Sequence, residues 1–180
     1  MTMQKLTQQQ MGRLSAEEFA AMEKLPVVAV LDNVRSAGNV GAFFRTSDAF
    51  GTSGVVLCGI TATPPQKEIH KTALGAELTV AWRRFDTTAE AVQQLRSEGY
   101  AVWAVEQVEG SVSLADFEPE AGQRYALVFG NEVDGVAQEV VDLCDGAIEI
   151  PQVGTKHSLN VAVTGGVVLW HMFSRMTQCK

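Results

Sequence analysis

The chain has 180 residues, of which 46% are hydrophobic and 19% are charged, and its formal net charge at pH 7 is −7. This length is enough for a sizeable hydrophobic core and favours one domain over two. The sequence starts with a polar segment and contains no run of about 20 apolar residues, so we expect a soluble protein without an export signal.

The first 25 residues are predicted to form a helical extension that precedes the main domain. Ser15 and Glu18 have the spacing of a capping box, in which each side chain accepts a hydrogen bond from the backbone of the other residue. This spacing predicts a short helix over 16–24, and Pro26 is expected to end it. The main domain is then expected over 26–180.

Six short runs rich in β-branched and apolar residues predict six strands, at 27–32, 54–59, 79–84, 100–106, 125–130 and 147–151. Helical patterns separate them, at 39–51, before Gly75, at 87–98, around 140–143 and at 158–176. The acidic segment 110–122 is expected to be mostly loop. This alternation predicts a single α/β domain with a six-stranded parallel sheet and helices on both faces.

The last predicted helix is apolar on nearly every side, with the sequence LNVAVTGGVVLWHMF. A helix without a polar face needs neighbours all round, so we expect it to be deeply buried. Gly165 and Gly166 lie in its middle, where each glycine costs about 1 kcal/mol relative to alanine, and a close approach of another element would compensate. We therefore expect a homodimer that pairs through this C-terminal helix.

The excess negative charge is concentrated in 101–150, which holds eleven acidic residues against one basic residue, Arg124. The rest of the chain carries 13 basic and 10 acidic residues, so a locally basic face for nucleic acid is possible despite the net charge. Its candidate members are Arg35, Arg45, Lys67, Lys71, Arg83, Arg84 and Lys156. Scattered solvated charges are the alternative interpretation.

Several common catalytic and metal-binding patterns are missing from the sequence. It contains no GxGxxG, GxxxxGK[ST] or GxSxG motif, which disfavours dehydrogenases and P-loop enzymes. The cysteines (Cys58, Cys144 and Cys179) and the histidines (His70, His157 and His171) show no metal-ligand spacing, so we expect no metal site. The cysteines are expected to be ordinary apolar residues in a reducing cytoplasm. Only His157, in a glycine-flanked loop, is left open.

Polar side chains follow three of the predicted strands, at the point where each strand ends. They are Asn33, Arg35, Asn39 and Arg45 after the first strand, Asn131 and Glu132 after the fifth, and Lys156, Ser158 and Asn160 after the sixth. Parallel strands end at the same edge of a sheet, so the three loops are expected to converge on one crevice. Taken singly, Asn39 and Ser158 could instead be helix N-caps and Glu132 a surface turn residue.

The three loops in this order resemble the three motifs of the SpoU/TrmH group of SPOUT methyltransferases. The matching stretches are NVRSAGNVGAFFRTSDAFG, VFGNEVDGV and IPQVGTKHSLNVAVTGG. The resemblance implies transfer of a methyl group from S-adenosyl-L-methionine to a ribose 2′-hydroxyl of structured RNA, tRNA or rRNA. It also implies a C-terminal deep trefoil knot over about 128–176, whose loops hold the methyl donor.

The resemblance also implies roles for individual residues. The catalytic set would be Arg45, Asn39, Glu132, Ser158 and Asn160, with Arg45 gripping a phosphate and stabilising charge on the ribose oxygen. The donor-binding set would be Val105, Glu106, Gly130, Ile150, Ser158 and Leu159. Arg35, Lys67, Lys71 and Lys156 would contact RNA. Two alternatives stay open: a knotted RNA-binding dimer without catalysis, and a SPOUT enzyme that methylates a base.

Overall fold

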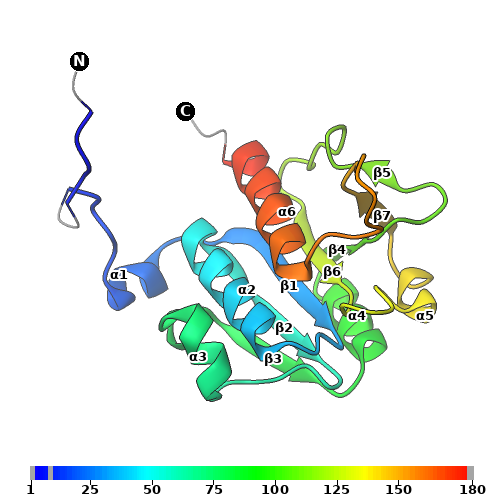
Figure 1. Cartoon of the computed structure of the whole chain (residues 1–180), viewed down its shortest axis with the longest axis horizontal. Coiled ribbons are helices and arrows are strands. Elements are labelled where there is room, and N and C mark those ends of the chain that lie inside the picture. The colour runs from blue at the N-terminus through cyan, green and yellow to red at the C-terminus, as the bar shows by residue number, and fades with distance from the viewer. Residues whose placement is uncertain (1–2, 8–9, 178–180) are drawn as a thin grey trace.

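Seven parallel strands form one sheet in the computed structural model, which describes residues 3–7 and 10–177 (Figure 1). The strands are β1 (Leu25–Asp32), β2 (Thr52–Cys58), β3 (Trp82–Phe85), β4 (Tyr100–Val105), β5 (Val112–Ser113), β6 (Arg124–Phe129) and β7 (Gly146–Glu149), in the spatial order β3-β2-β1-β6-β4-β7-β5. The prediction of six strands is therefore wrong by one. The additional strand, β5, has two residues and pairs with β7 at the edge, so it is too short to show a sequence period.

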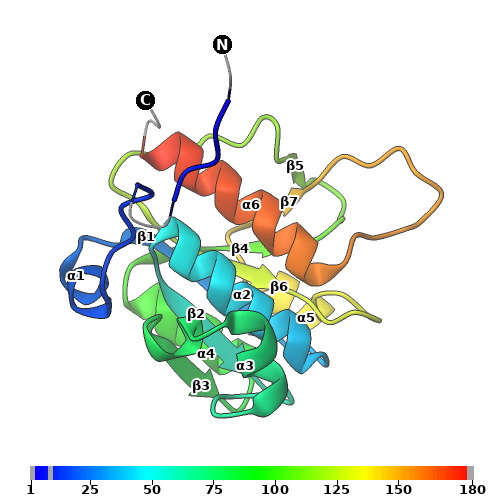
Figure 2. The same ribbon diagram turned by 60° about the vertical axis from the view of Figure 1, so that its left-hand side comes forward.

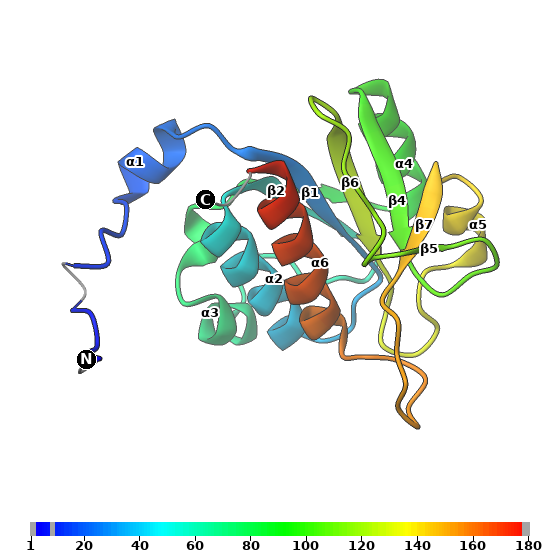
Figure 3. The same ribbon diagram turned by 90° about the horizontal axis from the view of Figure 1, so that it is seen from above.

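Helices cover both faces of the sheet, as predicted. They are α1 (Ala16–Ala21), α2 (Ala37–Phe50), α3 (Lys67–Ala73), the 3₁₀ helix η1 (Ala76–Leu78), α4 (Thr88–Ser97), α5 (Gln138–Val141) and α6 (Val161–Met176). Figure 3 shows α2, α3 and α6 on one side of the sheet and α4 and α5 on the other.

The inner strand β1 contributes side chains to the hydrophobic layers on both faces of the sheet, because successive side chains of a strand point to opposite faces. Val27, Ala29 and Leu31 join the cluster beneath α2, α3 and α6, while Val28 and Val30 join the cluster beneath α4. All five are buried. This explains why the strand reads as a continuous apolar run rather than an alternating one.

The N-terminal helix is shorter than predicted. Ser15 and Glu18 do form the capping box, but α1 ends at Ala21 rather than at residue 24. Pro26 does not end the helix, because it lies inside β1, which begins at Leu25, one residue before the expected domain boundary. Figure 1 shows α1 and the segment before it extending away from the sheet.

The last helix, α6, is not buried all round, so that expectation is wrong for the single chain. Val168, Leu169 and Met172 are buried, and Figure 2 shows α6 lying beside α2. Val163, Val167 and Trp170 form an exposed strip on the helix, with Trp170 52% exposed. The homodimer through this helix stays a prediction.

The two central glycines of α6 have different surroundings. A Cβ atom on Gly165 would lie 2.3 Å from the ring of Phe43 on α2, so the expected close neighbour is an aromatic side chain rather than backbone. A Cβ atom on Gly166 would meet nothing within 4 Å. Only the first glycine is required by packing within the chain.

The cysteines of the described ranges behave as apolar residues. Burial raises the pKa of Cys58 to about 12 and that of Cys144 to about 11, which disfavours the reactive thiolate. Cys179 lies outside the described residues. In the part of the chain that the structure describes, no helix is long and apolar enough to cross a bilayer.

Candidate functional site

A cavity of about 460 Å³ lies at the carboxyl ends of β4, β6 and β7. These ends adjoin because Val105 of β4 pairs with Phe129 of β6 and with Ile148 of β7. Two loops complete the wall, the loop 130–135 after β6 and the segment 150–160 after β7, which Figure 2 shows projecting from the domain. The site is therefore at the strand edge where the sequence predicts it.

The loop after β6 is closed by its own hydrogen bonds. The backbones of Asn131 and Gly135 pair in both directions at 3.1 Å, and Asn131 Oδ1 accepts from the backbone N–H groups of Val133 (3.0 Å) and Asp134 (2.9 Å). A Cβ atom on Gly130 would lie 1.9 Å from the carbonyl carbon of Gly135. Glycine is thus required at 130 by the return of the chain, whatever binds in the cavity.

Two carboxylates hold this loop in place, from the ends of β1 and β4, the two strands that flank β6. Glu106 Oε2 accepts from the backbone N–H of Val136 at 2.9 Å. Asp32 is 1% exposed, and its Oδ2 accepts from the backbone N–H of Ala137 (3.1 Å) while its Oδ1 accepts from the hydroxyl of Thr88 (2.5 Å). A buried carboxylate with several donors is a strong local constraint. The loop is therefore fixed to β1, β4 and α4.

Glu132 joins the same loop to the segment after β1. Its carboxylate accepts from the backbone N–H groups of Arg35 (3.0 Å) and Ser36 (3.2 Å) and from Nδ2 of Asn39 (2.8 Å). Partial burial favours the neutral acid, but the hydrogen bonds from Arg35, Asn39 and Ser36 outweigh it and lower the pKa of Glu132. The carboxylate is therefore a charged acceptor at neutral pH, and it is more than a surface turn residue.

Asn39 and Asn160 extend this connection to the third segment. Asn160 Nδ2 donates to Asn39 Oδ1 at 3.3 Å, and Asn160 Oδ1 caps α6 by accepting from Ala162 (2.9 Å) and Val163 (3.3 Å). Ser36, not Asn39, caps α2, and Asn160, not Ser158, caps α6. The chain of side chains Glu132–Asn39–Asn160 thus links the three loops that were expected to converge.

The structure brings most of the predicted site residues to this cavity. All six predicted donor-binding residues line it: Val105, Glu106, Gly130, Ile150, Ser158 and Leu159. Glu132 and Asn160 of the predicted catalytic set line it as well, and Asn39 adjoins it through its two hydrogen bonds.

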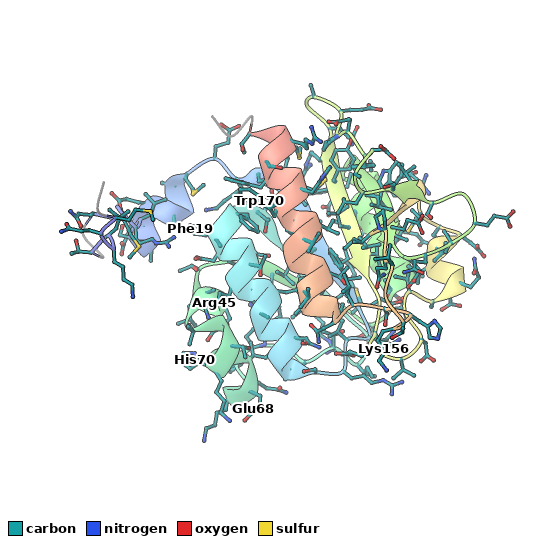
Figure 4. The ribbon with its side chains drawn as sticks, turned by 45° about the horizontal axis from the view of Figure 1, so that its top comes forward. Phe19, Arg45, Glu68, His70, Lys156 and Trp170 are labelled. Carbon is teal, nitrogen blue, oxygen red and sulfur yellow. The ribbon has the colours of Figure 1, made fainter. Side chains whose placement is uncertain are left out.

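Arg45 lies apart from the cavity of its own chain. It is exposed on α2, about 9 Å along the helix axis from Asn39 at 1.5 Å per residue, and it does not line the cavity. Within the described ranges it has no hydrogen bond or ion pair. Figure 4 shows Arg45 and Lys156 well separated on the molecule.

The predicted RNA-contacting cations fall into two groups. Arg35 lies 3.5 Å from Asp134, and Lys71 lies 2.7 Å from Glu68, so both have a carboxylate partner. Lys67 and Lys156 are exposed, and neither has an ion pair in residues 3–7 and 10–177. The four cations do not form one patch, since Lys67 and Lys71 are on α3 and Lys156 is on the projecting segment.

Comparison with known proteins identifies the family. The sequence model of the SpoU rRNA Methylase family matches residues 26–170. The chain belongs to this family. It is 31% identical over 161 residues to the 23S rRNA (guanosine-2′-O-)-methyltransferase RlmB of Vibrio cholerae, a match that covers 89% of this chain and 64% of that protein. The chain spans less than two thirds of the curated relatives that it matches.

Solved structures of SpoU proteins share the fold. An AdoMet-bound rRNA methyltransferase from Sinorhizobium meliloti superposes with a TM-score of 0.75 at 29% identity, covering 83% of this chain and 59% of that one. A TrmH/SpoU tRNA modifying enzyme from A. aeolicus superposes with a TM-score of 0.80 at 24% identity, covering 91% and 81%.

Sequence reasoning missed several residues of this SpoU site. Asp32 was read only as the last residue of a buried strand, although an aspartate there is a signal because burial demands partners for its charge. Gln152 and Thr164 lie within the third matching stretch and line the cavity, but the sequence assigned no role to either residue. His157, left open by the sequence, is exposed and also lines the cavity.

Proposed function

We propose that this protein transfers a methyl group from S-adenosyl-L-methionine to a ribose 2′-hydroxyl in tRNA or rRNA. The observation that carries the proposal is the cavity whose three bordering loops are linked by Glu132, Asn39 and Asn160. Membership of the SpoU family and the AdoMet-bound relative support it.

The residues of the cavity fit the methyl donor. Apolar side chains, among them Val105, Ile150 and Leu159, suit an adenine ring, while the backbone of 130–135 offers polar groups. Glu106, Glu132, Asp134 and Glu149 line the cavity without any lysine or arginine, which suits a donor that carries a sulfonium charge. When bound, the donor supplies an activated methyl group.

The remaining task of the protein is to place and polarise the ribose. A guanidinium is a poor base because its pKa is above about 12, so we assign Arg45 to gripping a phosphate and stabilising negative charge on the ribose oxygen. Asn39 positions the first loop, Glu132 holds that loop through its backbone donors, and Asn160 fixes the start of α6. Ser158 would contact the donor.

We propose that a homodimer completes the active site. Val163, Val167 and Trp170 expose an apolar strip on α6, and a second subunit seated there would also cover the neighbouring face of α2. Since Arg45 lies outside the cavity of its own chain, this pairing would give each cavity Arg45 of the partner subunit. This arrangement agrees with the exposed and unpaired state of Arg45 in the described part of the chain.

We also propose that 128–176 forms a deep trefoil knot within the domain 26–180, that 1–25 is a separate helical extension, and that the protein works in the cytoplasm. The chain path supports the knot, since β7 lies outside β4 whereas α6 returns to pack on α2 and β1. The segment between them adjoins the loop 130–135 at the cavity, where the proposed knot would have it cross.

Two measurements test the proposed function. Calorimetry should detect binding of S-adenosyl-L-methionine, and incubation with the donor and RNA from a strain lacking the gene should yield a 2′-O-methylated nucleoside in mass spectra of the digested RNA. Arg45→Ala should lower turnover by about 100-fold or more, by analogy with the loss of one charge-stabilising group, with donor binding nearly unchanged. Wild-type turnover in that variant would refute the role of Arg45.

The same measurements separate the two alternatives. Absence of donor binding would favour an RNA-binding protein without catalysis. A methyl group on a base instead of the sugar would favour a base-modifying enzyme. Both results would overturn the proposal.

A further inference from the structure

His70 of α3 and the buried carboxylate of Glu77 on η1 form a pair that the proposed reaction does not use. His70 Nδ1 lies 2.5 Å from Glu77 Oε1, and Glu77 Oε2 accepts from the backbone N–H of Gly75 at 3.1 Å. The side chain of Glu77 is 6% exposed, whereas that of His70 is 65% exposed. The carboxylate is therefore enclosed while the imidazole faces solvent.

The enclosed carboxylate carries a negative charge at neutral pH. Burial favours its neutral form, but the hydrogen bonds from His70 and Gly75 outweigh burial and lower the pKa of Glu77. With Nδ1 turned toward Glu77, the other ring nitrogen of His70, Nε2, is left on the exposed side. In an imidazolium both nitrogens donate, so Nε2–H is then available to an external anion.

The helix that carries His70 is fixed against the helix that carries Arg45. The hydroxyl of Thr72 donates to the carbonyl of Gly38 at 2.9 Å, and a Cβ atom on Gly41 would lie 2.3 Å from the carbonyl oxygen of Ile69. The backbones of α2 and α3 are thus in contact, and Arg45 and His70 lie on the same side of the molecule in Figure 4. RNA held by Arg45 would pass close to α3.

The other charges near this face leave a positive excess when His70 is protonated. The charged groups on α2, α3 and η1 are Arg45, Asp48, Lys67, Glu68, Lys71 and Glu77. Glu68 and Lys71 neutralise each other at 2.7 Å, Asp48 accepts from the hydroxyl of Thr79 at 3.2 Å, and Glu77 is enclosed. Arg45 and Lys67 have no ion-pair partner in the described ranges.

We propose that His70 is a phosphate contact for the RNA, through Nε2–H of its imidazolium, and that Glu77 is a positioning residue that holds the ring. The inference rests on the proposed function and names a binding residue for its substrate. A protonated His70 adds one cationic contact on α3, the helix of Lys67, on the same side of the molecule as Arg45 (Figure 4), and this contact is made only when the imidazole is charged.

The kinetics of His70→Gln test the proposal. Glutamine retains a donor for Glu77 but has no titratable charge, so the buried carboxylate keeps a partner. With bulk tRNA and bulk rRNA from the gene-deletion strain as separate probes, we expect the KM for the methyl-accepting RNA to rise about three- to tenfold at pH 6, with kcat unchanged at saturating RNA. The difference from wild type should shrink toward about pH 8, because the contact needs a charged imidazole.

The salt dependence gives a second, independent readout. Loss of one phosphate contact should weaken the salt dependence of RNA binding. The magnitude of the slope of log affinity against log salt concentration should fall by about one for a duplex and slightly less for a single strand. A structural role of His70 would not change this slope. An unchanged slope with an unchanged KM would overturn the inference.

Two glutamate variants provide a matched control. Glu77→Gln keeps an acceptor for Gly75 but removes the charge that holds His70, so it should raise the KM for RNA as His70→Gln does. Glu68→Gln removes an exposed carboxylate on α3, the helix of His70, and frees Lys71 from its ion pair. This variant should lower the KM for RNA or leave it unchanged. A rise of equal size in both variants would contradict a specific role for Glu77.

The failure of this inference is distinguishable from the failure of the proposed function. If the wild type binds the donor and methylates RNA but His70→Gln matches it in KM and salt slope, only the contact is wrong. A fall in kcat at unchanged KM would also overturn the contact and point to proton transfer by His70. If the wild type neither binds the donor nor methylates RNA, the proposed function itself fails.

Discussion

Glu132 is the side chain on which the geometry of two loops depends. Its carboxylate accepts three hydrogen bonds from the segment after β1, two of them from the backbone N–H groups of Arg35 and Ser36. A single acidic residue on the loop after β6 therefore sets the conformation of the loop after β1. Asn39, oriented by Glu132, in turn accepts from Asn160, so the effect reaches the third loop.

Replacing Glu132 with glutamine should destabilise the fold in a pH-dependent way. The amide has one acceptor oxygen for three donors, so at pH 7 we expect a loss of about 1 kcal/mol or less in the free energy of unfolding, since the site is exposed. The pKa of Glu132 is lower in the folded protein than its ordinary value of 4.5. Its contribution is therefore complete above pH 4.5 and disappears as the pH falls through the folded pKa.

Urea unfolding of wild type and Glu132→Gln at a series of pH values measures this difference. Glu109→Gln is the control, because Glu109 is exposed and its side chain has no hydrogen bond or ion pair in the described ranges. A difference between wild type and Glu132→Gln that does not shrink at any pH below 4.5 at which both proteins stay folded would contradict the assigned contacts, since protonation of the carboxyl should remove them.

At the scale of elements, the two adjacent glycines of α6 differ in how closely other atoms pack against them. Gly165 faces the ring of Phe43, which is 1% exposed and packs 4.9 Å from the ring of Phe129, so the ring has no room to move. Gly166 faces open space in the chain. The two positions have the same sequence context and different packing.

Gly165→Ala and Gly166→Ala should therefore differ in sign. Overpacking against Phe43 should cost Gly165→Ala about 1–3 kcal/mol in the free energy of unfolding, while Gly166→Ala should gain up to about 1 kcal/mol from helix propensity. Chemical denaturation of the two variants beside wild type measures both changes. Equal destabilisation of the two variants would contradict the packing described for α6.

Most elements could be predicted because their local signals agree with their tertiary environment. Buried strands such as β1 are continuous apolar runs, and α4 begins at a capping box formed by Thr87 and Glu90. The sequence-based prediction was wrong where a contact from another element determines the secondary structure. Pro26 is accommodated in β1 near an irregularity of its pairing with β2, and β5 exists only through its pairing with β7. Neither outcome has a local signal.

At the scale of the whole molecule, the cavity could be predicted better than the position of Arg45, the proposed catalytic arginine. Residues that follow parallel strands must share an edge, so the lining was accessible from the order of strands and loops. The place of Arg45 relative to a cavity depends on its distance along α2 and, in the proposed homodimer, on the subunit that would cover the helix. Arg45 follows Asn39 closely in the sequence motif. On α2, however, the two residues lie about 9 Å apart along the helix axis.

Subunit mixing tests whether Arg45 serves the cavity of the partner subunit. Arg45→Ala and Asn160→Ala should each give a nearly inactive homodimer, because the first lacks the arginine at both sites and the second disturbs both cavities. In a mixed dimer, the cavity of the Arg45→Ala subunit is intact and receives the arginine of the other chain. Random reassociation of equal amounts makes half of the dimers mixed, so about a quarter of wild-type activity should return. If Arg45 acts within its own chain, every site of a mixed dimer lacks one residue, and no activity would return even when sedimentation shows that mixed dimers have formed.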